Sequence, residues 1–102
     1  MRIHQWLKIL AQGEGSDLFL ATGAPPCAKF AGELKTIAPD VLAPGEVAAI
    51  ADEIMDDTQR EEFARELEMN LALFMPGIGR FRVNIFRQLN EVSIVSRFIV
   101  SE

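Results

Sequence analysis

Residue types that usually carry catalysis are sparse in this chain, which has one histidine, His4, and one cysteine, Cys27. A metal site needs several histidine, cysteine or carboxylate ligands at suitable spacing, and a cysteine nucleophile needs a base that activates it. Two isolated residues supply neither arrangement. We therefore predict no metal site, and we expect Cys27 to be a small buried residue in a strand.

Phosphate-binding loops are also missing from the sequence. The pattern G-x-x-x-x-G-K-[ST] surrounds phosphates with backbone amides and a lysine. Gly23 and Lys29 come nearest to it, but the second glycine and the hydroxyl residue are absent. The acidic residues between positions 52 and 66 are typical of solvated helix faces rather than of a catalytic carboxylate pair. We therefore predict no catalytic residue and no cofactor bound by this chain alone.

Two arginines remain as candidates for a binding site. Arg82 lies on the polar side of an alternating strand pattern at residues 80–86. If Leu89-Asn90 forms the tip of a hairpin, paired residues have numbers that sum to 179, and Arg82 then lies opposite Arg97. Like charges directly opposite each other on neighbouring strands destabilise a sheet by a few tenths to about 1 kcal/mol. One interpretation is that an anion binds between them; the other is that acidic neighbours or solvation make the pair harmless.

The elements that would position these arginines follow from the spacing of the apolar residues. The order helix, three strands, two helices, three strands has no βαβ rhythm, so we predict an α+β fold with a mostly antiparallel six-stranded sheet. Phe63 and Leu67 are expected to face inward from the third helix. The sequence predicts three helices: one at residues 3–10, one that begins at Pro44 and one that follows an N-cap at Asp57. It predicts strands at 17–21, 27–30, 34–37, 71–74, 80–86 and 92–100, with Gly32-Glu33 as a hairpin turn.

Length and composition limit the class of protein. The chain has 102 residues, of which 49% are hydrophobic, and a net charge of −5. We predict a single domain spanning residues 1–102. The negative charge argues against binding to nucleic acid regardless of sequence. A single cysteine and the lack of about 18 consecutive apolar residues predict a soluble, cytoplasmic protein without membrane insertion.

Several short motifs occur in one order along almost the whole chain. They are Gly15–Leu20 (GSDLFL), Gly23–Pro26 (GAPP), Gly32–Leu34 (GEL) and Pro76–Asn84 (PGIGRFRVN). Together they resemble the PilT/PilU retraction ATPases of type IV pili, used in twitching motility. Phe19 stands where the PilT branch usually has histidine, so the resemblance favours the PilU branch.

This resemblance implies a hexameric cytoplasmic motor whose subunits have two domains. The N-terminal domain of the family is a PAS-like α+β unit, and the C-terminal domain is RecA-like, holds the Walker motifs and binds ATP and Mg²⁺. The chain stops at Ser101-Glu102, about where the first domain of the family ends. The resemblance thus implies a non-catalytic N-terminal domain. Its partners would be the RecA-like domains of its own and neighbouring subunits and the machinery at the pilus base.

The resemblance also assigns a role to two residues. In the family, two arginines of the N-terminal domain reach the nucleotide phosphates when the domains close. By motif they correspond to Arg82, in Arg80-Phe81-Arg82, and to Arg97, in Ser96-Arg97-Phe98. Because closed rings need contacts from both domains, we expect the isolated chain to be a monomer or a weak dimer.

Two other functions remain open at this point. A free-standing PAS-like sensor would need a deep apolar pocket with a few polar groups for a small ligand. A protein-interaction module would need an exposed apolar patch. A filled core with Arg82 and Arg97 on an exposed face of the sheet favours the motor domain instead.

Overall fold

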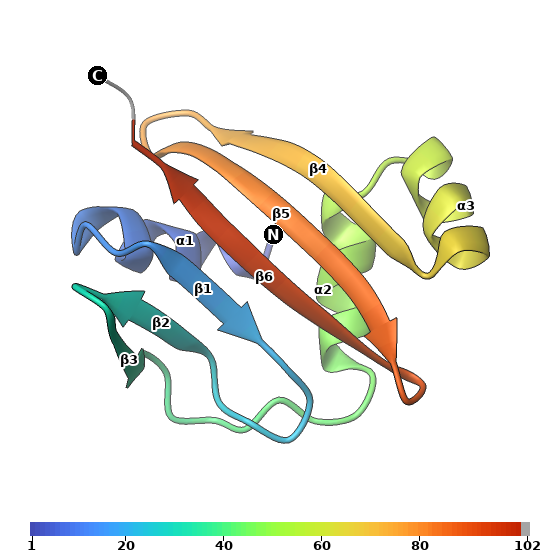
Figure 1. Ribbon diagram of the computed structural model, residues 1–102, viewed down its shortest axis with the longest axis horizontal. Coiled ribbons are helices and arrows are strands. Elements are labelled where there is room, and N and C mark those ends of the chain that lie inside the picture. Colours follow the sequence, from blue (N-terminus) through green and yellow to red (C-terminus); the bar gives the residue numbers. More distant parts are fainter. Residues whose placement is uncertain (101–102) are drawn as a thin grey trace.

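Three helices and six strands follow one another in the predicted order (Figure 1). The computed structural model describes residues 1–100; Ser101 and Glu102, where the resemblance places the end of the domain, lie outside the described residues. No helix within residues 1–100 is long and apolar enough to cross a membrane. The elements are α1 (Ile3–Gln12), β1 (Asp17–Leu20), β2 (Cys27–Phe30), β3 (Glu33–Thr36), α2 (Glu46–Ile54), α3 (Asp57–Glu66), β4 (Glu68–Met75), β5 (Gly79–Gln88) and β6 (Glu91–Ile99).

The six strands form one sheet in the order β3-β2-β1-β6-β5-β4. Every neighbouring pair is antiparallel, so the predicted antiparallel sheet is confirmed. The pairing of β1 with β6 joins two three-stranded units, one from each half of the chain (Figure 1). Residues 17–20 therefore lie beside residues 94–97 in the middle of the sheet.

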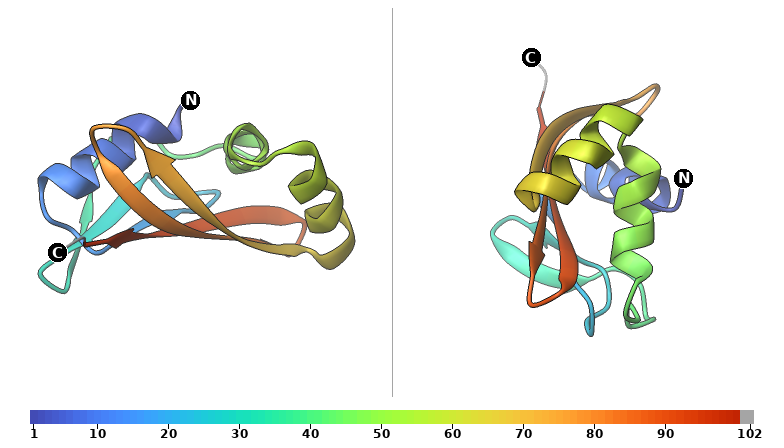
Figure 2. Two further views of the ribbon diagram at one scale, coloured as in Figure 1. Left: turned by 90° about the horizontal axis from the view of Figure 1, so that it is seen from above. Right: turned by 90° about the vertical axis from the view of Figure 1, so that its right-hand side faces the viewer.

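Helices α1 and α2 lie on one side of the sheet, and no helix of residues 1–100 covers the opposite side (Figure 2). Side chains alternate between the two sides along a strand. In β5, Phe81, Val83 and Ile85 are buried against the helices, as their alternation predicts. The helices add two apolar stripes to the same core, namely Ile3, Trp6, Leu7 and Leu10 from α1 and Val47, Ile50, Ala51 and Ile54 from α2.

Both helices predicted in the middle of the chain begin at other residues than expected. Gly45 has φ +88°, a left-handed conformation, so α2 begins at Glu46 and Pro44 precedes it. The N-cap of α3 is Asp56, not Asp57. The Asp56 carboxylate accepts a hydrogen bond from the Gln59 backbone N–H at 2.8 Å, and the Gln59 side chain accepts one from the Asp56 N–H at 2.9 Å. This reciprocal capping box satisfies two backbone donors, which one aspartate at position 57 could not do.

Three predictions about single positions were wrong. Leu67 was expected to face inward, but it ends α3 in a left-handed conformation (φ 62°) and is 48% exposed. The hairpin between β2 and β3 turns at Ala31-Gly32, both with positive φ, rather than at Gly32-Glu33. Cys27 is only half buried, because its side chain lies on the uncovered side of the sheet and its thiol donates to the Pro25 carbonyl at 3.2 Å.

Candidate anion-binding face

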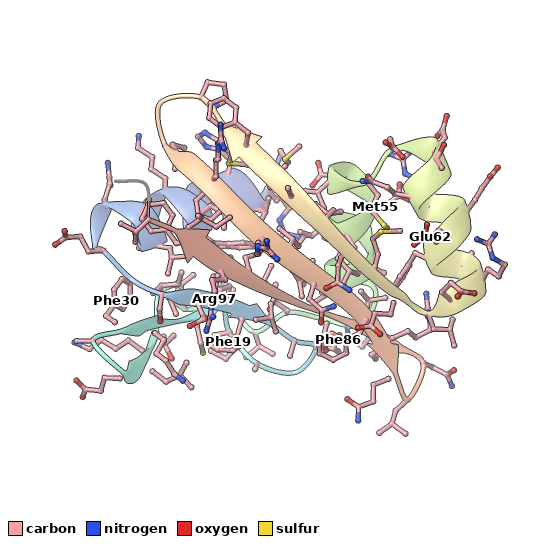
Figure 3. The ribbon with its side chains drawn as sticks, turned by 45° about the horizontal axis from the view of Figure 1, so that its top comes forward. Phe19, Phe30, Met55, Glu62, Phe86 and Arg97 are labelled. Carbon is pink, nitrogen blue, oxygen red and sulfur yellow. The ribbon has the colours of Figure 1, made fainter. Side chains whose placement is uncertain are left out.

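Arg82 and Arg97 are direct partners in the ladder between β5 and β6. Leu89 and Asn90 form the tip of this hairpin, both with positive φ, as a two-residue turn of this kind requires. The neighbours Val83 and Ser96 are buried against the helices, so both arginines project from the uncovered side. The predicted register and the shared face are confirmed, and Figure 3 shows Arg97 on this side of the sheet.

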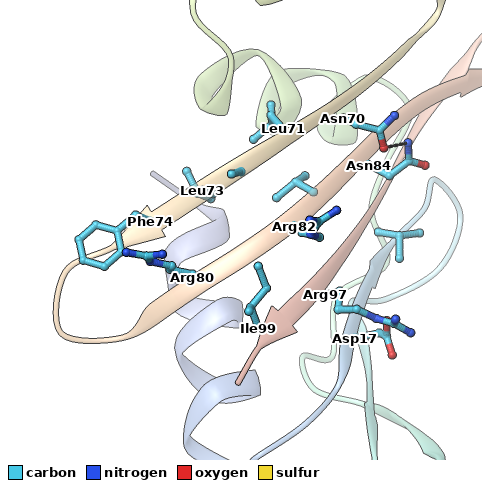
Figure 4. A pocket seen from close by; sticks show the side chains of 13 residues that line it. Asp17, Asn70, Leu71, Leu73, Phe74, Arg80, Arg82, Asn84, Arg97 and Ile99 are labelled. Atoms are coloured by element: carbon cyan, nitrogen blue, oxygen red, sulfur yellow. Dashed lines mark hydrogen bonds and ion pairs between the residues drawn. The ribbon is translucent and has the colours of Figure 1, made fainter. Parts of the chain in front are cut away.

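The two arginines line an open groove of about 860 Å³ on the uncovered side of the sheet (Figure 4). We call this the arginine groove and define it by its polar residues Asp17, Asn70, Arg80, Arg82, Asn84 and Arg97. Apolar side chains, among them Phe74, Val95 and Ile99, complete its walls. The groove is open to solvent and crosses four strands, which distinguishes it from a deep pocket inside the core.

The three arginines of the groove differ in what they contact. The Arg80 guanidinium lies 5.9 Å from the centre of the Phe74 ring, a cation–π contact on the strand beside it. Arg97 has an acidic partner in Asp17. Within residues 1–100, Arg82 makes no side-chain hydrogen bond and no ion pair. The residues that line the groove thus carry three positive charges and one negative charge, a balance that suits an anion.

Asp17 is the groove residue that sequence reasoning did not single out. It is the first residue of β1 and pairs with Lys29 on one side and with Arg97 on the other. Its Oδ1 accepts a hydrogen bond from Arg97 Nε at 3.4 Å, and its side chain is 13% exposed against 70% for Arg97. The contact joins residues 80 positions apart, and no local pattern signals it.

The other polar residues considered from the sequence lie away from the groove. His4 is exposed on α1, beside Met75 and Pro76 of the hairpin between β4 and β5. Among the described residues, no three histidine, cysteine, aspartate or glutamate side chains come together as they would around a metal ion.

Within the groove, Asn84 donates to Asn70 Oδ1 at 2.9 Å and to Glu68 at 3.2 Å, which fixes the amides at one end of the groove.

Known proteins resemble this chain in sequence and in fold, although no protein-family model matches it. The type IV pilus ATPase PilU of Pseudomonas aeruginosa is 36% identical over 99 residues, which are 97% of this chain and 26% of PilU. The type IV pilus retraction ATPase PilT of the same organism is 36% identical over 102 residues, which are all of this chain and 30% of PilT. The chain thus spans less than a third of the length of these relatives.

Solved structures support the same relationship. The crystal structure of the pilus retraction motor PilT with bound ADP superposes with a TM-score of 0.81 over 94% of this chain and 29% of PilT, at 27% identity. The Legionella pneumophila ATPase DotB shares the fold, with a TM-score of 0.80 over 96% of this chain and 29% of DotB, at 23% identity. Equal identity to PilU and PilT does not separate these two branches. The chain is homologous to the type IV pilus ATPases PilU and PilT, and its fold matches the N-terminal domain of PilT.

Proposed function

We propose that this chain is the non-catalytic N-terminal domain of a type IV pilus retraction ATPase, in which Arg82 and Arg97 sense the phosphates of a nucleotide. The observation that carries this function is the pair of like charges held side by side on an uncovered face of a PilT-like fold. Directly opposed cations destabilise a sheet unless something compensates them. Asp17 offsets part of the charge at Arg97, and a phosphate group between the two guanidinium groups would offset the rest.

The chemistry of the groove fits phosphate oxygens and does not fit a metal ion. Guanidinium groups are always charged and donate several N–H bonds in a planar fork that matches phosphate geometry. Mg²⁺ prefers carboxylate and water oxygens, and Asp17 is the single carboxylate among the groove residues. The ATP and Mg²⁺ of the motor would therefore be held by a RecA-like domain outside this chain, and the arginines would meet only the phosphates.

The uncovered side of the sheet suits closure onto a second domain. It combines the arginines with the apolar side chains of Val95, Ile99 and the exposed Phe74. When a nucleotide is present, the arginines would stabilise the negative charge on its phosphates and so favour the closed arrangement. Nucleotide occupancy would in this way be coupled to the movement of the domain.

The remaining features of the proposed motor rest on the family resemblance of the sequence. The domain would pack against RecA-like domains of its own and neighbouring subunits in a cytoplasmic hexamer, at the base of the pilus machinery. A single domain supplies only part of the ring contacts, so the isolated chain would be a monomer or a weak dimer. Phe19, in place of the histidine usual in the PilT branch, favours a PilU-like parent.

The sensor alternative finds less support in the described residues. A small-ligand sensor needs a concave, mostly buried apolar pocket. The arginine groove is open to solvent, lies outside the core and carries three guanidinium groups. These features favour contact with a charged group that arrives on another domain.

The proposed function can be tested by grafting this chain into a known motor. In the PilT graft, this chain replaces the matching 30% of Pseudomonas aeruginosa PilT. We expect the graft to hydrolyse ATP at least about a hundredfold faster than PilT lacking the domain, because arginines at the phosphates typically raise the rate by about a thousandfold or more. A graft that folds and assembles but turns over no faster than the truncated protein would contradict the proposed function.

A further inference from the structure

Asp17 is nearly buried beside an arginine that is exposed. Its backbone is fixed on both sides, since β1 pairs with β2 and with β6 at this position. Next to it, the Ser16 N–H donates to the Lys29 carbonyl, and the Phe98 N–H donates to the Ser16 carbonyl, each at 2.9 Å. The carboxylate therefore sits on a rigid part of the sheet, whereas the Arg97 side chain that it contacts is long and 70% exposed.

The contact uses only one edge of the Arg97 guanidinium. Asp17 Oδ1 accepts from Nε at 3.4 Å, and within residues 1–100 the two terminal amino groups of Arg97 make no hydrogen bond. A guanidinium has five N–H donors, and the three that lie off the Nε edge stay available away from Asp17.

Asp17 could act on an anion in two opposite ways. A carboxylate near a phosphate repels it, which would make Asp17 a competitor for Arg97. A carboxylate that holds Arg97 in place lowers the entropy lost when the side chain is ordered around the anion. Lys29, which is paired with Asp17 in the ladder, adds a positive charge on the other side and so weakens the repulsion. This balance favours the positioning role.

We propose that Asp17 is a positioning residue for Arg97, holding the Nε edge of the guanidinium so that its terminal amino groups face the phosphate. This role deepens the proposed function and rests on it. Arg97 is then oriented before the nucleotide arrives, while Arg82, which has no such partner within the described residues, is ordered only by the phosphate itself.

Calorimetric titration of this chain with sodium tripolyphosphate at constant ionic strength tests the role of Asp17. Asp17→Ala should weaken binding by about threefold to tenfold, which is the typical effect of leaving one long side chain unordered. Asp17→Asn should bind as tightly as the natural chain or more tightly, because its amide oxygen still accepts from Nε and its charge is gone. Asp57→Ala is the matched control, since it removes an aspartate paired with Arg60 on α3, outside the groove.

Arg97→Lys is a second variant that does not disturb the sheet. A lysine keeps the charge but cannot donate to Asp17 along one edge and to phosphate along another, so we expect a similar loss of affinity. Wild-type affinity in Asp17→Ala or in Arg97→Lys, or tighter binding by both Asp17 variants, would overturn the positioning role alone. A natural chain that binds no tripolyphosphate would overturn the proposed function and this role together.

Discussion

Arg82→Ala and Arg97→Ala, each introduced into the PilT graft, are expected to lower ATP turnover by on the order of a hundredfold or more. Arginines that reach transferring phosphates contribute about a thousandfold or more to phosphoryl transfer. Both side chains project from the uncovered side of the sheet, and neither is part of the core. Their truncation should change the stability of the domain by no more than about 0.5 kcal/mol. Steady-state ATPase assays and thermal melting separate the two effects.

Arg87 and Arg65 provide the controls for this experiment. Arg87 faces the helices and lies over the Phe63 ring, and Arg65 is on α3, so neither lines the arginine groove. Alanine at either position should leave turnover nearly unchanged. The double variant of Arg82 and Arg97 should lose less than the product of the single losses, because both would grip one phosphate group. Wild-type turnover in both single variants would exclude the arginine pair from the mechanism.

Phe81→Ala is expected to destabilise the chain by about 3 to 5 kcal/mol, the usual effect of removing a buried phenylalanine side chain. Phe81 is 0% exposed, and its ring centre lies 5.3 Å from that of Phe98 on the neighbouring strand. Phe81 comes directly before Arg82, and Phe98 comes directly after Arg97. The packing of the two rings therefore fixes the strands that carry the groove. A loss of this size is a large fraction of the stability of an ordinary domain. Urea unfolding followed by circular dichroism measures it.

Phe74→Ala is the matched control, because Phe74 belongs to the adjacent strand but is 63% exposed. Its removal exposes little new apolar surface and leaves no cavity, so we expect a change below about 1 kcal/mol. If Phe81→Ala unfolds at nearly the same urea concentration as the Phe74 variant, the core is not centred on β5 as the structure places it.

The pairing of Arg82 with Arg97 could be predicted because every step of it is local. Alternating residues at 80–86 define the two faces of β5, and a two-residue tip at Leu89-Asn90 then fixes the register with β6. Since one shift in register would move every side chain to the other face, the buried pattern of one strand determines that of its partner. The element order could likewise be predicted from apolar spacing and from the prolines and glycines between segments.

Asp17 could not be predicted as a groove residue, because its position depends on which strands meet. The pairing of β1 with β6 brings residue 17 to residue 97, and neither strand's own pattern identifies the other as its neighbour. The N-cap of α3 was predicted at the wrong residue for a different reason. Asp56 and Asp57 are equally good capping residues by type, and only the Gln59 side chain, which completes the capping box, selects Asp56.

The most direct test of the anion-binding face is a titration of the ¹⁵N-labelled chain with tripolyphosphate, followed through the side-chain Nε–Hε signals of its arginines. Alanine variants assign each signal to one residue. We expect the Arg82 and Arg97 signals to shift together along one binding curve, since the two guanidinium groups are direct partners in the sheet. The Arg65 and Arg87 signals, which come from residues outside the groove, should stay in place. Shifts at Arg65 or Arg87 with unmoved signals at Arg82 and Arg97 would contradict a phosphate site at this face.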